Sequence, residues 1–193
     1  MLLRKSSYLL GLVLLLAACT KPYHPYQGTV KILPGAEVYY QAPHALSSQP
    51  YEIKGKRYPI IKQPIGYSVQ GTAQIMPMSQ AHYTTLIHEQ WRNEEFVGAH
   101  PSLPLPSYVS VTNMNNGRRT IVRLIDRQPV SGNAMITLSP AVADQLLLTP
   151  LTPIQIDYID VSSTGAINGK LAVAIDEVRK SYPLPQAPEI KMP

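Results

Sequence analysis

The chain has 193 residues, 45% of them hydrophobic, which fits one globular domain with tails and excludes a wholly disordered protein. Its 19 prolines and a charged fraction of only 15% favour many turns and short extended segments, and hence a mainly β fold. The formal charge is +5 without any block of five Lys or Arg residues, so we expect no nucleic-acid partner.

The N-terminus carries the pattern of a secretion leader. Arg4 and Lys5 precede an apolar run, residues 8–18, which is too short to span a bilayer comfortably. The run ends in Leu-Ala-Ala-Cys, which matches a bacterial lipobox, and Cys19 is the only cysteine of the chain. We therefore predict a lipoprotein signal peptide over residues 1–18 and lipidation of Cys19, as by palmitate. The alternative is an ordinary signal peptide with an incidental cysteine.

A lipidated Cys19 would hold the protein at a membrane, since each buried methylene of an acyl chain contributes about 0.8 kcal/mol. The next residue is Thr20, not the aspartate that resemblance to bacterial lipoproteins would associate with inner-membrane retention. We therefore expect an anchor in the outer membrane, with the protein facing the periplasm. Removal of the leader lowers the formal charge to +3.

The first mature segment is rich in Pro, Tyr, Gly and Ser and shows no helical periodicity. We expect residues 19–50 to form a tether, with one strand near Ala36–Tyr40. From Tyr51 onward the pattern is of short strands separated by turns, beginning with a hairpin around Lys54-Gly55-Lys56.

Residues 107–126 give the strongest hairpin signal. Val109 and Val111 alternate along the first strand, Asn116-Gly117 supplies a left-handed turn, and an apolar second strand follows. Further strands are predicted at residues 133–140 and 153–161.

One helix is predicted, after the strand at 133–140. Ser139 is a suitable N-cap, Pro140 fits the first helical position, and Thr149-Pro150 ends the segment. Residues 80–96 fit a helix or a long loop equally well.

The histidines and carboxylates are the candidate residues for catalysis or metal binding. His88 opens the stretch His-Glu-Gln-Trp-Arg, but position 92 is not the second histidine that a zinc helix requires, so we expect no metal and no cofactor. Asp126 closes the strand Thr-Ile-Val-Arg-Leu-Ile-Asp and could act as a general acid or base. On the residues alone, a turn cap or a surface ion pair with Arg127 is the better interpretation of Asp126, and His100 could simply cap a turn.

Two stretches together give a more specific indication. "AHPSLPLPSYVSVTN" and "NGRRTIVRLIDRQP" resemble the rare lipoprotein A family of septal lytic transglycosylases in order, spacing and residue type. The resemblance covers roughly residues 50–160. It implies a six-stranded double-psi β-barrel with one or two short helices, in a protein that acts on peptidoglycan during cell wall organisation and division.

The resemblance also suggests how the chain is divided. We expect a leader, a tether, a barrel domain and a partly flexible C-terminal extension, over residues 1–18, 19–50, 51–161 and 162–193. The glycan-binding repeat domain that many members carry after the barrel is expected to be absent. Peptidoglycan glycan strands, the membrane and cell-division proteins are the implied partners.

Two catalytic positions of the family correspond to His100 and Asp126. The family reaction implies that Asp126 protonates the glycosidic oxygen after N-acetylmuramic acid. The C6 hydroxyl of the same sugar then attacks its anomeric carbon and leaves a 1,6-anhydro end. His100 would orient or share the proton.

The chain departs from the family pattern close to these positions. The family expects Ser-Trp-Tyr-Gly after Gly-Thr-Ala, whereas here residues 74–77 are Gln-Ile-Met-Pro, and Gln128 replaces a glycine. A catalytically inactive barrel that binds glycan strands or a division partner is therefore the alternative.

Overall fold

The computed structural model describes residues 26–53, 55–80, 82–127 and 134–168, which form a mainly β structure with one α-helix among them. Its strands are β1 (Lys31–Ile32), β2 (Tyr51–Ile53), β3 (Lys56–Tyr58), β4 (Ser68–Ile75), β5 (His82–Thr84), β6 (Gln90–Arg92), β7 (Val97–Ala99), β8 (Ser107–Asn113), β9 (Arg118–Asp126), β10 (Ala134–Leu138), β11 (Ile154–Val161) and β12 (Ile167–Asn168). The helix α1 spans Pro140–Leu146, and 3-10 turns lie at Ala45–Ser47 and Met78–Gln80.

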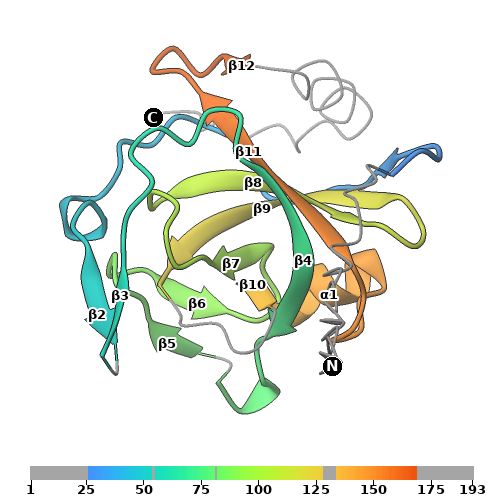
Figure 1. The fold of residues 1–193 in the computed structure, drawn as a ribbon, viewed down its shortest axis with the longest axis horizontal. Helices are drawn as coiled ribbons and strands as arrows, with labels where there is room; N and C mark the ends of the chain where they lie inside the picture. The colour runs from blue at the N-terminus through green and yellow to red at the C-terminus, as the bar shows by residue number, and fades with distance from the viewer. Residues whose placement is uncertain (1–25, 54, 81, 128–133, 169–193) are drawn as a thin grey trace, which may run out of the picture.

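Six of these strands close into a barrel (Figure 1). Following the hydrogen bonds around it gives the order β9, β7, β10, β4, β11 and β8, and β8 pairs again with β9. The β7–β9 and β10–β4 pairs are parallel, whereas the other four pairs are antiparallel. Closure leaves these six strands without a free edge. The expected mainly β class with a six-stranded barrel is confirmed.

The predicted hairpin at residues 107–126 is confirmed as β8 and β9. Gly117 has φ +72°, the left-handed conformation that glycine adopts without steric cost, and lies at the predicted turn. A second predicted turn, at Gly55 between β2 and β3, also has positive φ, +75°.

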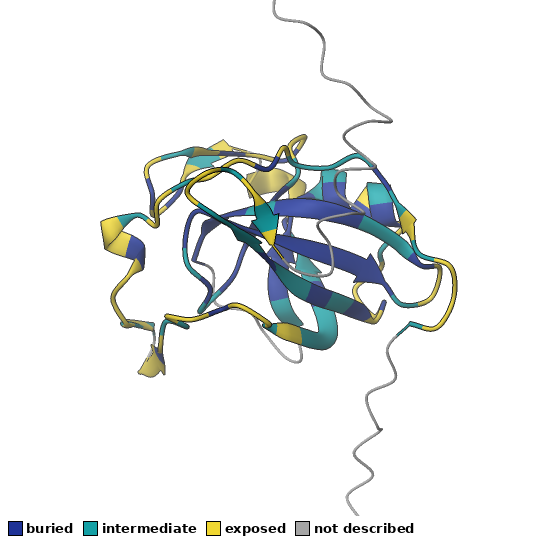
Figure 2. Cartoon of the chain, turned by 90° about the horizontal axis from the view of Figure 1, so that it is seen from above, coloured by how far each residue is buried: buried dark blue, intermediate teal, exposed yellow. Residues whose placement is uncertain are grey.

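The barrel interior is filled by branched and aromatic side chains. Residues that are fully enclosed there include Val109, Val111, Leu124, Ile136 and Ile154. β8 is buried along its whole length, and on its outer face Tyr108 packs with Val38. Figure 2 shows buried residues along the barrel strands and exposed residues mainly in the loops and outer hairpins.

The helix begins as its sequence predicts. Ser139 accepts a hydrogen bond from the Val142 amide through its side chain, and Pro140 occupies the first turn. The helix ends sooner than Thr149-Pro150, because Leu147 takes a left-handed conformation as C-cap.

Two sequence-based expectations need correction or completion. The prediction of a strand near Ala36–Tyr40 was wrong. The strand that this segment does form is β1, which pairs in parallel with β9. Gly35 follows it and lies so close to β9 that a Cβ would come 2.6 Å from the Ile121 carbonyl oxygen. Residues 80–96 are neither a helix nor one long loop, since β5 and β6 form a hairpin there.

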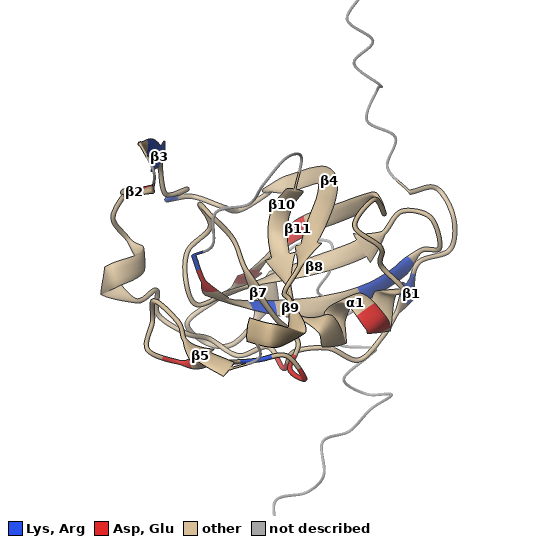
Figure 3. Cartoon of the chain, turned by 90° about the horizontal axis from the view of Figure 1, so that it is seen from below, with Lys and Arg blue, Asp and Glu red and all other residues tan. Residues whose placement is uncertain are grey.

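Charged residues of both signs are spread over the described chain, as Figure 3 shows. Within the described ranges no helix is both long enough and apolar enough to cross a membrane. Cys19 and the leader lie outside the described residues, as does most of the predicted C-terminal extension.

Candidate active site at the end of β9

The parallel pairing of β7 with β9 brings the two predicted catalytic residues to the same end of the barrel. Ala99 lies opposite Asp126 in the register, and the next residue along the chain is His100. The backbone amide of His100 donates to the Asp126 carbonyl at 3.1 Å. Both residues are buried, with exposed fractions of 3% for His100 and 6% for Asp126.

The Asp126 carboxylate accepts two hydrogen bonds at the edge of a cavity. The Tyr83 hydroxyl donates to Oδ2 at 2.8 Å, and the Leu86 backbone amide donates to Oδ1 at 3.0 Å. The cavity, called here the Asp126 cavity, has a volume of ≈ 360 Å³ and is lined by Leu46, Gln49, Tyr51, Ile53, Leu86, Asp126 and Arg127. A carboxyl group is therefore placed at the edge of a half-open, largely apolar cavity that a substrate group could enter.

Tyr83 is the main site residue that sequence reasoning missed. It lies in β5, and its ring stacks on that of Trp91 in β6, with centroids 5.7 Å apart and planes 18° apart. Trp91 is itself fully buried and donates from Nε1 to the Asn93 side chain at 2.9 Å. An aromatic pair from this hairpin thus lies beside Asp126.

The turn between β5 and β6 is fixed from two sides. The Thr85 amide donates to the Glu89 carbonyl at 2.8 Å, which closes the turn that carries Leu86. Glu89 in turn makes a bidentate ion pair with Arg123 of β9, with N–O distances of 2.5 and 2.7 Å. The amide that binds Asp126 is therefore held by the same strand that carries Asp126.

His100 is held in one tautomer. Nδ1 accepts from the Ser102 and Leu103 amides at 3.1 and 3.0 Å, so the ring proton resides on Nε2, which lies 3.1 Å from the Tyr67 hydroxyl oxygen. Burial, reinforced by the positive charge of Arg127, lowers the pKa of His100 to about 3. The imidazole is therefore neutral near pH 7.

Arg127 is buried, which disagrees with the alternative of a surface ion pair with Asp126. Its guanidinium donates to the carbonyls of His100 at 2.8 Å, of Ser47 at 2.9 Å, and of Leu103. Burial lowers the pKa of Arg127 to about 10, so it stays protonated at neutral pH. Its Nε is buried with no hydrogen-bond partner among the described residues.

The proline loop, residues 100–106, is clamped between these groups. Leu103 and Leu105 are fully buried in the core, while the prolines remove backbone donors that would otherwise need partners. Ser47 donates through Oγ to the Leu105 carbonyl at 2.7 Å, and the His44 amide donates to the same oxygen at 2.7 Å. The carbonyls of His100 and Leu103 are thus satisfied by Arg127, and that of Leu105 by residues 44–47.

The residues that replace the family's Ser-Trp-Tyr-Gly motif do not line the Asp126 cavity. Gln74 and Ile75 end β4, and Met76 is 2% exposed within the barrel core. Gln128 lies outside the described residues. Aromatic groups at the cavity come instead from Tyr83, which donates to the carboxylate, and Tyr51, which lines the cavity.

No protein-family model matches the chain, whereas several curated proteins do. The protein of Yersinia pestis named endolytic peptidoglycan transglycosylase RlpA is 36% identical over 185 residues, covering 92% of this chain and 51% of that protein. Proteins of the same name from Salmonella typhimurium and Escherichia coli are 33% and 32% identical, over 92% and 91% of this chain. The chain spans about half the length of these relatives.

Proposed function

Because the chain is a homologue of the RlpA peptidoglycan transglycosylases over about nine-tenths of its length, we propose that it cleaves peptidoglycan glycan strands as a lytic transglycosylase. The observation that carries the proposal is the position of Asp126, a buried carboxyl group at the edge of the ≈ 360 Å³ Asp126 cavity. Lytic cleavage needs one group that donates a proton to the leaving oxygen, and the proposal assigns this role to Asp126.

The hydrogen bonds of Asp126 favour one of its two oxygens as the carrier of the proposed catalytic proton. Oδ1 accepts from the Leu86 amide, which can only donate, and an unprotonated oxygen is the stronger acceptor for it. Oδ2 faces the Tyr83 hydroxyl, which can donate to the carboxylate or accept from the carboxylic acid. The proton therefore belongs on Oδ2, and Tyr83 can serve both protonation states.

The proposed reaction needs no water. Asp126 transfers its Oδ2 proton to the glycosidic oxygen that joins N-acetylmuramic acid to N-acetylglucosamine. As the anomeric bond breaks, the C6 hydroxyl of the muramic residue attacks the anomeric carbon and its proton passes to the Asp126 carboxylate. The acid is regenerated and a 1,6-anhydro end is left. Attack from within the same sugar provides a high effective concentration of nucleophile.

His100 is assigned a positioning role in this proposal. The neutral ring binds the amides of Ser102 and Leu103 and directs its Nε2 proton to Tyr67. It thereby fixes the start of the proline loop, whose His100 amide binds the Asp126 carbonyl. Arg127 fixes the same loop through the carbonyls of His100 and Leu103.

The experiment is incubation of the purified chain with peptide-free glycan strands, followed by mass spectrometry of the products. We expect 1,6-anhydromuramic ends from the parent chain and a loss of about a hundredfold or more in rate for Asp126→Asn. Asp160→Asn, on β11 beside β12, is the matched control and should leave the rate unchanged. An Asp126→Asn variant as active as the parent would refute the assignment, and absence of product from the parent would favour a non-catalytic glycan-binding protein.

We further propose that Cys19 carries the lipid, that the protein is held in the outer membrane facing the periplasm, and that it acts in cell wall organisation at division. The lipobox pattern before Cys19 and Thr20 after it support this placement. Metabolic labelling with a palmitate analogue should mark the parent chain and not Cys19→Ala. In cell fractionation, the Cys19→Ala chain should appear in the periplasmic fraction and the parent chain in the membrane fraction. A labelled Cys19→Ala chain would exclude this anchor.

A further inference from the structure

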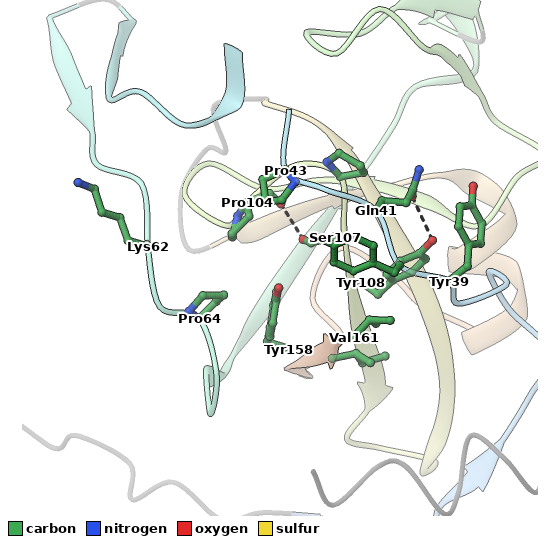
Figure 4. A pocket seen from close by; sticks show the side chains of 13 residues that line it. Tyr39, Gln41, Pro43, Lys62, Pro64, Pro104, Ser107, Tyr108, Tyr158 and Val161 are labelled. Atoms are coloured by element: carbon green, nitrogen blue, oxygen red, sulfur yellow. Dashed lines mark hydrogen bonds between the residues drawn. The ribbon is translucent and has the colours of Figure 1, made fainter. Parts of the chain in front are cut away.

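A second hollow lies on the outer surface of the barrel, and its lining shares no residue with that of the Asp126 cavity (Figure 4). This tyrosine groove, with a volume of ≈ 180 Å³, is lined by Tyr39, Tyr40, Gln41, Pro43, Lys62, Pro64, Pro104, Pro106, Ser107, Tyr108, Tyr158, Ile159 and Val161. Tyr39 and Tyr40 are 49% and 45% exposed, although both carry large rings. Four tyrosines and four prolines thus surround one surface depression.

Three of the seven polar side chains that line the groove, those of Gln41, Ser107 and Tyr108, take part in hydrogen bonds within the protein. The Tyr108 hydroxyl donates to Gln41 Oε1 at 3.1 Å, and the same oxygen accepts from Arg123 Nε at 2.7 Å. Ser107 donates through Oγ to the Pro104 carbonyl at 2.7 Å. Flat rings and prolines together form the kind of surface that binds extended proline-rich peptide segments.

We propose that the tyrosine groove binds the proline-rich C-terminal segment of the same chain, residues 182–189. This segment reads Tyr-Pro-Leu-Pro-Gln-Ala-Pro-Glu and contains Pro185-Gln186-Ala187-Pro188, the spacing of two prolines that aromatic grooves recognise. Glu189 follows directly, and Lys62 supplies a positive charge at the groove. The proposal is independent of the catalytic function.

The path of the chain makes this contact accessible. Ile167 of β12 pairs with Val161, which lines the groove, so the described chain leaves the barrel beside the groove wall. Fourteen residues separate Asn168 from Pro183 and could span up to about 45 Å when extended. A segment tethered in this way has an effective concentration of the order of millimolar, so even weak contacts would keep the groove occupied.

The test compares tyrosine ring signals by NMR in the full chain and in a variant with Pro183, Pro185 and Pro188 replaced by Ala. We expect the signals of Tyr39, Tyr40 and Tyr158 to shift in the variant while that of Tyr83 does not. Gln186→Ala, which keeps all three prolines, is the matched control and should resemble the parent. A synthetic peptide of residues 182–190, added to the proline variant, should restore the parent signals in a saturable manner.

A second groove variant guards against indirect effects. Tyr40→Ala changes a side chain that is 45% exposed, so the fold should persist. Introduced into the proline variant, it should weaken binding of the synthetic peptide at least tenfold. Identical tyrosine signals in the parent and the proline variant would overturn the proposal. So would glycan strands that shift these tyrosines when the peptide does not, since the groove would then be a sugar site.

Discussion

At the scale of single residues, Tyr83 connects the fold to the proposed chemistry. Its hydroxyl donates to Asp126 Oδ2 while its ring stacks on Trp91, so one substitution can separate the hydrogen bond from the stacking. Tyr83→Phe keeps the stacked ring and removes the hydrogen bond to Asp126. Since hydrogen bonds to charged groups contribute about 1.5–3 kcal/mol, we expect kcat to fall about tenfold or more with little change in KM. Release of 1,6-anhydro ends gives the rate.

The matched control for Tyr83→Phe is Tyr108→Phe. Tyr108 also uses its hydroxyl in a hydrogen bond, but it lines the tyrosine groove rather than the Asp126 cavity. The control should retain the parent rate. If both variants were equally active, Tyr83 would have no part in positioning the Asp126 proton.

The buried His100 gives a prediction about how the stability of the fold depends on pH, rather than about the reaction rate. Its pKa is lowered to about 3 from 6.5, so between these values the unfolded chain binds a proton that the folded chain does not. Its contribution to stability is therefore fully present above pH 6.5 and is lost as the pH falls towards 3. In His100→Asn the side-chain oxygen can still accept from the Ser102 and Leu103 amides, but it cannot titrate.

The free energy of unfolding should consequently fall more steeply with acid in the parent than in His100→Asn. The difference in slope should reach at most about 1.4 kcal/mol per pH unit between pH 4 and 6, measured by denaturant unfolding. Parallel pH profiles for the two proteins would mean that His100 titrates normally in the folded state.

At the scale of elements, the proline loop depends on a cation that lies outside it. Arg127 reaches the carbonyls of His100, Leu103 and Ser47, and so ties the loop to the 3-10 turn at Ala45–Ser47. Arg127→Lys keeps the charge but cannot reproduce the planar arrangement of donors. Because each buried carbonyl left without a partner costs about 1–3 kcal/mol, we expect a loss of about 2–4 kcal/mol in stability.

The control for Arg127→Lys is Arg92→Lys. Arg92 is half exposed and its ion pair with Glu95 has an N–O distance of 3.8 Å, so the change should be below about 0.5 kcal/mol. Thermal and denaturant unfolding measure both variants. A loss for Arg127→Lys no larger than that of the control would show that the loop holds its shape without the guanidinium.

The contrast between two hairpins shows which elements can be predicted from sequence. β8 and β9 were predicted because Asn116-Gly117 marks the turn and the flanking residues alternate. The β5–β6 turn has no glycine: His88 takes the positive φ of 63°, and side-chain contacts such as the Arg123–Glu89 pair stabilise the turn. Long-range contacts of this kind leave no local pattern.

The difference between local patterns and long-range contacts also explains which residues of the candidate site could be predicted from the sequence. His100 and Asp126 were identified because they lie in stretches with family spacing. Tyr83 lies 43 residues from Asp126 in sequence, and only the packing of the β5–β6 hairpin brings them together. The sequence suggests Arg127 as a surface partner of Asp126. Its burial beneath the proline loop depends on tertiary contacts, which the local sequence does not reveal.

At the scale of the whole molecule, the barrel and the walls of the Asp126 cavity differ in construction. β8 pairs on both sides, with β9 and β11, and the six barrel strands have no free edge. Tyr51 and Ile53 of the cavity wall come from β2, a three-residue strand that pairs only with β3, and Leu86 comes from the β5–β6 turn. Asp126 therefore sits on the rigid part and faces peripheral elements.

This difference predicts a hierarchy in amide hydrogen exchange. Isolated two-stranded hairpins are only marginally stable, so the β2–β3 amides should open locally, whereas those of β8 and β9 should exchange only by global unfolding. We expect exchange in β8 and β9 to be at least a hundredfold slower, measured by mass spectrometry or NMR. If glycan strands bind in the Asp126 cavity, the Asp126→Asn chain mixed with them should show slower exchange in β2–β3 and at Leu86, with β8 unchanged. Equal protection of β2–β3 and β8 without glycan would mean that the cavity walls form one cooperative unit with the barrel.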